Sequence, residues 1–244
     1  MHPDPRFLPA GDQGLVVEFG DTIDPGINRR VRDLFVAVSA DSVAGVVDLT
    51  PTYRSLLVTY DPRRVSLSEL VSTLRLRAAS LARAEVPPPR ILEVPTVYGG
   101  AFGPDLPFVA AHNSLGEQEV VDIHAGTDYL VYMMGFSPGF PYLGGMSPRI
   151  ATPRLKTPRT AIPAGSVGIA QQQTGIYPVE SPGGWQLIGR TPVVLFDPER
   201  RPPVLLEAGD FIRFVPVSES EYAAIEADRR SGSWQPRLDE KRDQ

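Results

Sequence analysis

The stretch EVPPP (residues 85–89) divides the sequence into two parts with different hydrophobic patterns. Three consecutive prolines cannot continue a helix, and they favour a stiff, extended link. We therefore predict four parts, at residues 1–86, 87–90, 91–217 and 218–244. They are, in this order, a first domain, a proline linker, a second domain, and a C-terminal helix with a polar tail that frays.

Strand and helix patterns alternate before the prolines. Asp24-Pro25 is typical of a helix start, and the apolar residues that follow recur with the spacing of one helix face. A second helix begins at Ser66, which forms a capping box with Glu69. A closing strand near residues 91–94 would complete the βαββαβ order of a ferredoxin-like domain. Short apolar runs predict the other strands at residues 15–19, 43–49 and 55–60.

Short strands separated by turns follow the prolines, in a spacing typical of a closed β-barrel or a sandwich. Two helices precede them, and the second begins with a capping box of Ser114 and Glu117. The sequence therefore predicts an α+β protein in which a ferredoxin-like domain precedes a β-barrel. The strands are expected at residues 129–134, 166–171, 176–180, 185–188, 193–196, 204–206 and 211–215.

The composition excludes several functional classes. The 244 residues include no cysteine, which excludes disulfides, thiolate nucleophiles and cysteine-bound metals. No His/Asp/Glu cluster has metal-ligand spacing, so we expect no metal site. The net charge of -5 does not indicate the basic surface that nucleic-acid binding needs. No apolar run approaches the roughly 20 residues of a membrane span. Without a signal-peptide pattern, we expect a cytoplasmic protein that binds neither nucleic acid nor membrane.

An aromatic loop at residues 135–145 contains the pattern G-x-S-x-G, centred on Ser137. A nucleophile elbow needs a helix directly after the serine, and the following PGFP cannot begin one. All three histidines also precede Ser137, so we reject a serine nucleophile. The proline-stiffened loop carries Phe136, Phe140 and Tyr142 instead. These rings form either the wall of a small-molecule pocket or part of the core.

A basic loop follows at residues 153–160. It contains Arg154, Lys156 and Arg159 and no carboxylate, which suits either an anionic ligand or a solvated surface. No glycine-rich loop precedes Lys156, so the chain has no P-loop for ATP.

A third run, at residues 174–185, is rich in glycine and aromatic residues. Its acid, Glu180, acts as a base or pairs with Arg190. We interpret Gly183-Gly184 as a hairpin turn that precedes a strand starting at Trp185.

Several long runs, in the right order, resemble one known family. They are GDQGLVVEFG (11–20), GFSPGFPYLGG (135–145), PAGSVGIA (163–170) and ESPGGWQLIGRTP (180–192). Over roughly residues 8–217 the chain resembles the PxpB/KipI family, also known as allophanate hydrolase subunit 1 or carboxyltransferase subdomain C. The resemblance implies a ferredoxin-like domain followed by a cyclophilin-like β-barrel.

The resemblance leaves three activities open. The first is a non-autonomous subunit of an ATP-dependent 5-oxoprolinase that hydrolyses 5-oxo-L-proline to L-glutamate. Its partners would be a PxpC-like protein, similar to allophanate hydrolase subunit 2, and a PxpA-like third subunit. The alternatives are a carboxyltransferase component of an allophanate hydrolase or urea carboxylase, and a KipI-like inhibitor of a histidine kinase. We expect ATP to bind the complex, and the isolated chain to be inactive because it holds no complete catalytic set.

ATP-driven ring opening needs the lactam oxygen to be phosphorylated by ATP or polarised by cations, and it needs a base that delivers water. The candidate catalytic residues are His124, Glu180 and Lys156, with a buried structural role as the alternative for His124. The candidate substrate-binding residues are Arg159, Arg190, Phe136, Phe140, Tyr142, Tyr177, Gly183, Gly184 and Trp185.

We predict that limited proteolysis first cuts the chain near residues 87–90, because exposed links between domains are preferred cleavage sites. Mass spectrometry of the early fragments measures this. A main cut between residues 160 and 190, with the proline stretch intact, would contradict the proposed division.

Overall fold

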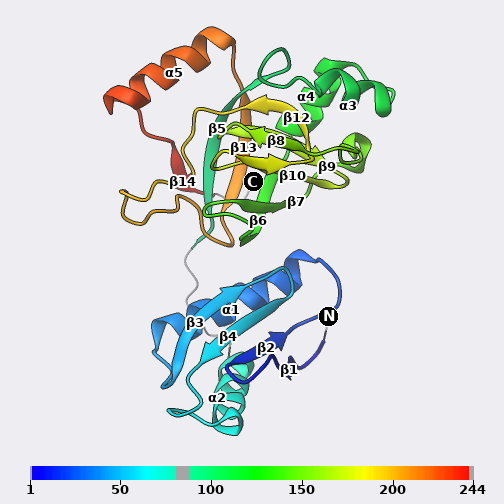
Figure 1. The fold of residues 1–244 in the computed structure, drawn as a ribbon. Helices are drawn as coiled ribbons and strands as arrows, with labels where there is room; N and C mark the ends of the chain where they lie inside the picture. The colour runs from blue at the N-terminus through cyan, green and yellow to red at the C-terminus, as the bar shows by residue number, and fades with distance from the viewer. Residues whose placement is uncertain (1, 81–87, 242–244) are drawn as a thin grey trace. The chain divides into compact units, whose positions relative to one another are not determined.

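The computed structural model describes residues 2–80 and 88–241 (Figure 1). The chain divides into two compact units, Met1–Pro88 and Pro89–Gln244. Within the expected linker, Pro87 lies outside the described residues, and Arg90 already begins a strand. The end of the expected tail, residues 242–244, also lies outside them.

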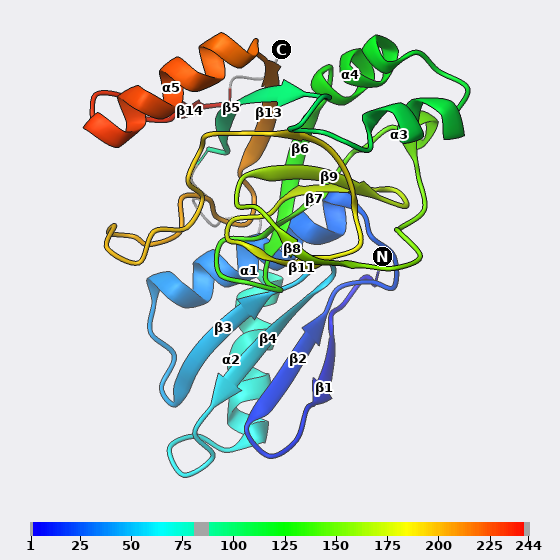
Figure 2. The ribbon, with the colours of Figure 1, turned by 45° about the horizontal axis from the view of Figure 1, so that its top comes forward.

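The first unit is a four-stranded antiparallel sheet with two helices against one face (Figure 2). Apolar side chains from both helices and from the sheet form one buried cluster. The strand order is β1 (Arg6–Pro9), β2 (Gly14–Glu18), β4 (Ser55–Tyr60), β3 (Val46–Pro51). The helices are α1 (Pro25–Ala40) and α2 (Leu67–Ala79).

The starts of both helices follow from local chemistry. The Asp24 side chain accepts a hydrogen bond from the backbone of Ile27 at 2.9 Å, and Pro25 occupies the first helical position. Ser66 and Glu69 form the reciprocal capping box at the start of α2. Both predicted helix starts are therefore confirmed.

The expected closing strand of the first domain is wrong. Residues 91–94 lie in β5 (Arg90–Tyr98), which belongs to the sheet of the second unit and pairs there in parallel with β13 (Phe211–Pro216). Strand β1 occupies the place beside β2 instead. The physical reason is that β5 buries side chains on both faces, such as Ile91 and Leu92, which suits a strand inside a barrel.

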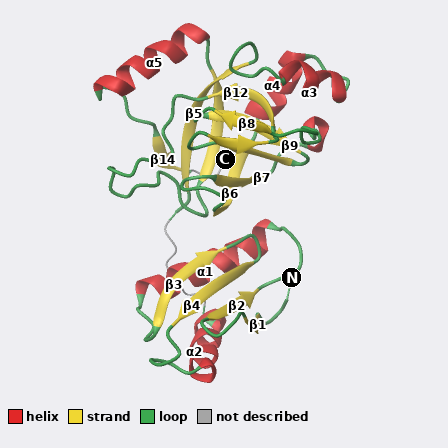
Figure 3. Cartoon of the chain, in the orientation of Figure 1, coloured by secondary structure: helices red, strands yellow, loops and turns green. Residues whose placement is uncertain are grey.

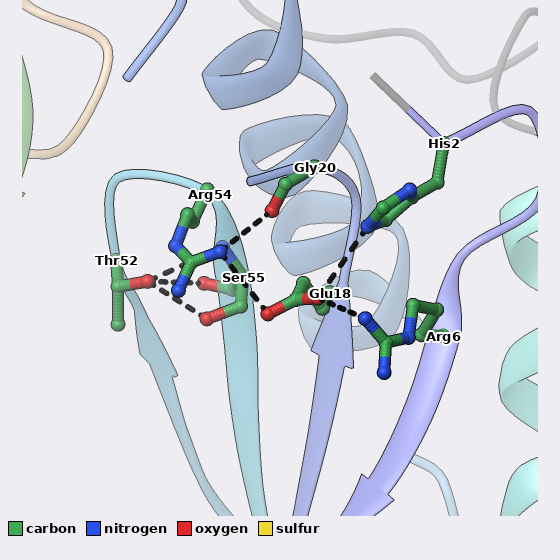
Figure 4. Close-up of polar contacts among 7 residues, drawn as sticks. All are labelled: His2, Arg6, Glu18, Gly20, Thr52, Arg54 and Ser55. Atoms are coloured by element: carbon green, nitrogen blue, oxygen red, sulfur yellow. Dashed lines mark hydrogen bonds and ion pairs between the residues drawn. The ribbon is translucent and has the colours of Figure 1, made fainter. Parts of the chain in front are cut away.

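Glu18, the last residue of β2, joins three segments of the first unit (Figure 4). Only 12% of its side chain is exposed, and its carboxylate contacts His2 and Arg6 at 3.4 Å and Arg54 at 3.3 Å. Arg54 also donates to the carbonyl of Gly20 at 3.1 Å. This carboxylate therefore anchors the N-terminal segment and the turn before β4 to the centre of the sheet.

The second unit is built on one strongly curved sheet. Its two end strands lie side by side, so that the sheet forms a nearly closed β-barrel within a mixed α/β unit. Helices lie around the strands in Figure 3. The sheet order is β10 (Gln173–Ile176), β9 (Ser166–Ala170), β12 (Gln186–Arg190), β5, β13, β6 (Asp128–Met134), β7 (Pro141–Gly144). The helices are α3 (Leu106–His112), α4 (Glu117–Ala125), α5 (Glu219–Ser231) and a short 3-10 helix, η2 (Pro148–Ile150).

Two short strands form a separate sheet at the barrel, β8 (Arg159–Ile162) and β11 (Ser181–Gly183). Gly183 lies within β11, so the expected hairpin turn at Gly183-Gly184 is wrong. The expected strands at 193–196 and 204–206 reduce to one bridge between Phe196 and Val204. The expected strand at 176–180 is displaced, because β10 ends at Ile176.

Two further local expectations are wrong. Ser114 does not cap α4, because its left-handed backbone (φ 57°) belongs to the turn that ends α3, and Gly116 occupies the N-cap position. The C-terminal tail does not simply fray. Strand β14 (Leu238–Glu240) pairs with β5, and Leu238 packs against the barrel core. The following Lys241 contacts Asp128 at 2.6 Å, which fixes this segment further.

We predict that Glu18→Gln lowers the free energy of unfolding by roughly 1–3 kcal/mol, because two guanidinium groups and an imidazole lose their anionic partner. Urea unfolding followed by circular dichroism measures the loss. Glu119→Gln is the matched control, since Glu119 forms an exposed pair with Arg149. Glu119→Gln should lower the free energy of unfolding by less than about 1 kcal/mol. Equal losses at the two positions would contradict the anchoring role of Glu18.

Candidate functional site

The second unit contains a cavity of about 360 Å³ with a mainly aromatic wall. We call it the aromatic pocket. Segments from four parts of the chain meet there: the loop between β6 and β7, the basic loop before β8, the residue after β10, and the end of β11. The lining residues are Phe136, Phe140, Tyr142, Arg154, Pro158, Tyr177, Pro182, Gly183, Gly184 and Trp185.

Phe140 is the central ring of this wall. It makes edge-to-face contacts with four other rings, at centroid distances from 5.3 to 5.9 Å. Such contacts are favoured by the quadrupoles of the rings and hold them in fixed orientations. Phe140 itself is buried, as are two of its partners, so the wall is rigid at its base. The four partners are Phe136, Tyr142, Tyr177 and Trp185.

Phe136 forms the exposed rim of the pocket. It is 67% exposed, and its φ of 60° places it in the left-handed region, which a bulky residue rarely adopts. Strained residues of this kind cluster at ligand-binding sites. The neighbouring turn depends on Gly139 (φ 80°), because an added Cβ would lie 2.8 Å from the Cβ of Phe196. The loop therefore holds an apolar ring out toward solvent at the pocket entrance.

Gly183 permits the opposite wall to come close. A Cβ at this position would lie 2.4 Å from the hydroxyl of Tyr177, so a residue with a side chain would push β11 away from the ring. Because the backbone of β11 lies close to the Tyr177 ring, the pocket is narrow. A ligand in the pocket would lie near the peptide groups of β11.

Two cations lie near the Tyr177 hydroxyl. Burial raises the pKa of Tyr177, while the backbone of Trp185 and the guanidinium groups of Arg154 and Arg159 oppose this rise. Arg154 lines the pocket, is exposed, and forms no ion pair with a carboxylate of the described chain. Arg154 is therefore the cation that is available to a ligand.

Arg159 is committed to a structural contact. Its Nη2 donates to Asp105 at 2.8 Å, and its Nη1 donates to the carbonyl of Trp185 at 3.4 Å. The second oxygen of Asp105 accepts from the backbone of Leu187 at 2.6 Å. Arg159 thus holds the basic loop to β12 and does not line the pocket, in contrast to the expectation that it binds substrate directly.

The other expected polar residues lie outside the pocket lining. Arg190 is at the far end of β12 from Trp185, with its guanidinium 5.6 Å from the ring centre of Phe102. Glu180 and Lys156 are both exposed. No ion pair links Glu180 to Arg190 among the residues that the structure describes. Neither Arg159 nor Arg190 lines the aromatic pocket, and substrate binding by these two residues stays a prediction.

His124 is a core residue. It is fully buried on α4, its Nδ1 lies 2.8 Å from the Tyr98 hydroxyl, and its Nε2 lies 2.8 Å from the hydroxyl of Thr174. Its ring also packs against Phe214, with centroids 4.4 Å apart. Burial lowers its pKa to about 3. The structure thus supports the structural alternative for His124, because a group shielded in this way cannot exchange a proton with a ligand in the aromatic pocket.

The lining of the pocket agrees largely with the expected substrate-binding residues. Seven of its ten lining residues are expected substrate-binding residues. The three that sequence reasoning missed are Arg154, Pro158 and Pro182. The sequence places Arg154 in the basic loop, but spacing cannot tell which cation of this loop faces a cavity. None of the lining residues is a carboxylate or a histidine, so the wall suits a small, flat anion and lacks the groups that most often act as a base.

The described residues contain neither a candidate metal cluster nor a candidate membrane-spanning helix. Within residues 2–80 and 88–241, no group of three or more His, Cys, Asp or Glu residues could hold a metal ion. In the same ranges, no helix is long and apolar enough to cross a membrane.

Comparison with known proteins places the chain in a family. Residues 5–206 match the family model of the carboxyltransferase domain, subdomain C and D. The chain belongs to this carboxyltransferase family. A relative from Bacillus subtilis (strain 168), named as a subunit of 5-oxoprolinase, is 45% identical over 88% of this chain and 93% of that protein. Another of the same name, from Escherichia coli O157:H7, is 42% identical over 88% of this chain and 97% of that protein. The family resemblance that the sequence indicates is confirmed.

The carboxyltransferase fold also recurs in a solved structure. The crystal structure of the K. lactis urea amidolyase matches 97% of this chain with a TM-score of 0.76 and 24% identity. This likeness shows the fold alone. The chain spans 16% of that protein, well under two thirds of its length.

We predict that the buried His124 makes the protein less stable as the pH falls from about 6.5 towards 3. In that window the unfolded state binds a proton that the folded state excludes, which costs roughly 1.4 kcal/mol per pH unit. Above pH 6.5 neither state is protonated and this contribution to stability is complete. NMR titration should show that the His124 imidazole stays neutral between pH 8 and 5, with exposed His112 as the reference.

The assignment of that signal follows from its loss in His124→Gln. His112→Gln is the matched control, since His112 lies on the exposed side of α3. Protonation of the His124 signal near pH 6.5 in the folded protein would contradict the assignment of His124 to the core.

Proposed function

We propose that this chain is a subunit of an ATP-dependent 5-oxoprolinase, a complex that hydrolyses 5-oxo-L-proline to L-glutamate. The observation that carries this proposal is its 45% identity with a named 5-oxoprolinase subunit along 93% of that relative. In this proposal the chain works with a PxpC-like partner and a PxpA-like third subunit. The complex acts in the cytoplasm, where ATP is supplied. The nearly closed barrel supports the cyclophilin-like class that the family resemblance implies.

The aromatic pocket is our candidate for the substrate-binding surface. A cavity of about 360 Å³ has room for a five-membered lactam. The apolar ring edge would lie against Phe140 and Trp185, and the carboxylate would pair with the guanidinium of Arg154. The narrow approach of Gly183 would orient the flat ring. Arg159 would act indirectly, because Asp105 holds it behind the pocket wall.

The chemistry would need groups from the partner subunits. Opening a lactam requires a base that delivers water and charge that stabilises the developing oxyanion, and the pocket wall offers no base. ATP does not fit the pocket either, because the lining has one guanidinium and no glycine-rich loop at a helix N-terminus. We therefore propose that ATP is bound elsewhere in the complex, and that the isolated chain does not turn over 5-oxoproline.

A second candidate function is a carboxyltransferase component that acts on urea or allophanate. The observation that favours it is the description of the matching family model as carboxyltransferase subdomains C and D. Biotin-dependent carboxylation of urea by the reconstituted complex would distinguish this function from ATP-dependent opening of 5-oxoproline.

We predict that Arg154→Gln lowers kcat/KM for 5-oxoproline by roughly 10- to 150-fold in the reconstituted complex, because a charge-assisted hydrogen bond to the substrate is lost. The measurement is 5-oxoproline-dependent ATP turnover with wild-type and variant chains, and with the isolated chain. Arg149→Gln is the matched control. It removes the same charge from an exposed pair outside the pocket, and its kcat/KM should stay within about twofold of wild type.

Each negative result would contradict a different part of the proposal. A wild-type complex without 5-oxoproline-dependent turnover would contradict the proposed function. A fully active Arg154→Gln complex would contradict only the pocket assignment. Turnover by the isolated chain would contradict the need for partner groups.

A further inference from the structure

Arg190 lies in a second cluster, at the opposite end of β12 from the aromatic pocket. At about 3.3 Å per residue, the five steps along the chain from Trp185 to Arg190 span roughly 16 Å. The guanidinium of Arg190 lies 5.6 Å from the ring centre of Phe102, and this ring lies 5.0 Å from the ring of Tyr222 on α5. Strand β12 and helix α5 therefore meet through a cation and two neighbouring rings.

Arg229 joins this cluster from the same helix. It follows Tyr222 by seven residues, which places both side chains on one face of α5. Burial raises the pKa of Tyr222, Glu226 adds to the rise, and Arg190, Arg229 and Arg230 oppose it. All three arginines are thus close enough to act on the phenol.

The Nε donors of Arg190 and Arg229, the two inner arginines, lack a hydrogen-bond acceptor in the described part of the chain. The Nε atoms of Arg190 and Arg229 are buried, and no described residue accepts a hydrogen bond from either. Leaving such a donor unsatisfied is unfavourable, so buried donors normally have an acceptor. The third arginine, Arg230, differs because its Nη2 pairs with Glu226 at 2.9 Å.

The cluster also carries uncompensated charge. Among the described residues no carboxylate pairs with Arg190 or Arg229, whereas Glu226 is already engaged by Arg230. Both inner arginines are partly exposed as whole residues, although their Nε atoms are buried. The cluster thus offers two guanidinium groups from separate elements, each with an unused donor.

We propose that Arg190 and Arg229, together with the Tyr222 hydroxyl, form a binding site for a phosphate group. A guanidinium matches two oxygens of a phosphate, and two such groups supply the charge that a dianion needs. Phe102 holds the first guanidinium in place, and α5 fixes the spacing of the second. Free phosphate and the phosphates of a nucleotide share this chemistry. The proposal goes beyond the 5-oxoprolinase function, because neither its residues nor its ligand belong to the aromatic pocket.

Isothermal titration calorimetry of the full chain with inorganic phosphate tests this site. We expect saturable binding with a single site, and a loss of affinity of at least about tenfold in Arg190→Gln and in Arg229→Gln. Arg75→Gln is the matched control, because exposed Arg75 also lies over an aromatic ring, 5.3 Å from the centre of Phe7, in the other unit. Its phosphate affinity should stay within about twofold of wild type.

A competition experiment with ATP distinguishes free phosphate from the phosphates of a nucleotide. Displacement of phosphate by ATP supports a nucleotide phosphate as the ligand, and no displacement supports free phosphate. Thermal melting of each variant, together with Tyr222→Phe, shows whether a loss reflects unfolding. Two results would overturn the proposal: no saturable binding of phosphate to the wild-type chain, or equal affinity in wild type and a folded double variant of Arg190 and Arg229.

Discussion

The Asp105 carboxylate receives hydrogen bonds from two segments that lie far apart in the sequence. One oxygen accepts from Arg159 at 2.8 Å and the other from the backbone of Leu187 at 2.6 Å. The backbone of Asp105 also donates to the carbonyl of Leu187 at 2.9 Å. Only 13% of this side chain is exposed, so the contacts form where water competes weakly. The start of α3, strand β12 and the basic loop are held together at this point.

This contact explains how one short strand can serve two sites. With the middle of β12 fixed to α3, Trp185 is held at one end against Phe140, and Arg190 is held at the other end against Phe102. The end with aromatic rings is narrow and carries one guanidinium, that of Arg154, in its lining. The end under α5 carries two unpaired guanidinium groups. The two ligands that we propose, an apolar ring and a phosphate, would therefore bind at opposite ends of one strand.

The parts that could be predicted from the sequence depend on near neighbours in the chain. Asp24 and Ser66 cap their helices through residues three positions away, and a pattern of that length is visible in the sequence. The aromatic wall was also predictable in outline, because rings on proline- and glycine-rich loops tend to meet at one end of a barrel. The parallel pairing of β5 with β13 joins residues 120 positions apart, and no local pattern reports it. Likewise, Arg159 pairs with Asp105, which lies 54 positions away in the sequence, and this contact keeps Arg159 out of the pocket lining.

In our proposal, the aromatic pocket holds the lactam ring of 5-oxoproline, with its carboxylate on Arg154. The most direct measurement is a crystal structure of the reconstituted complex with 5-oxo-L-proline bound. We expect the ring between Phe140 and Trp185, and the carboxylate about 2.7–3.2 Å from the Arg154 guanidinium. Substrate bound at another place in the complex, with an empty aromatic pocket, would contradict it.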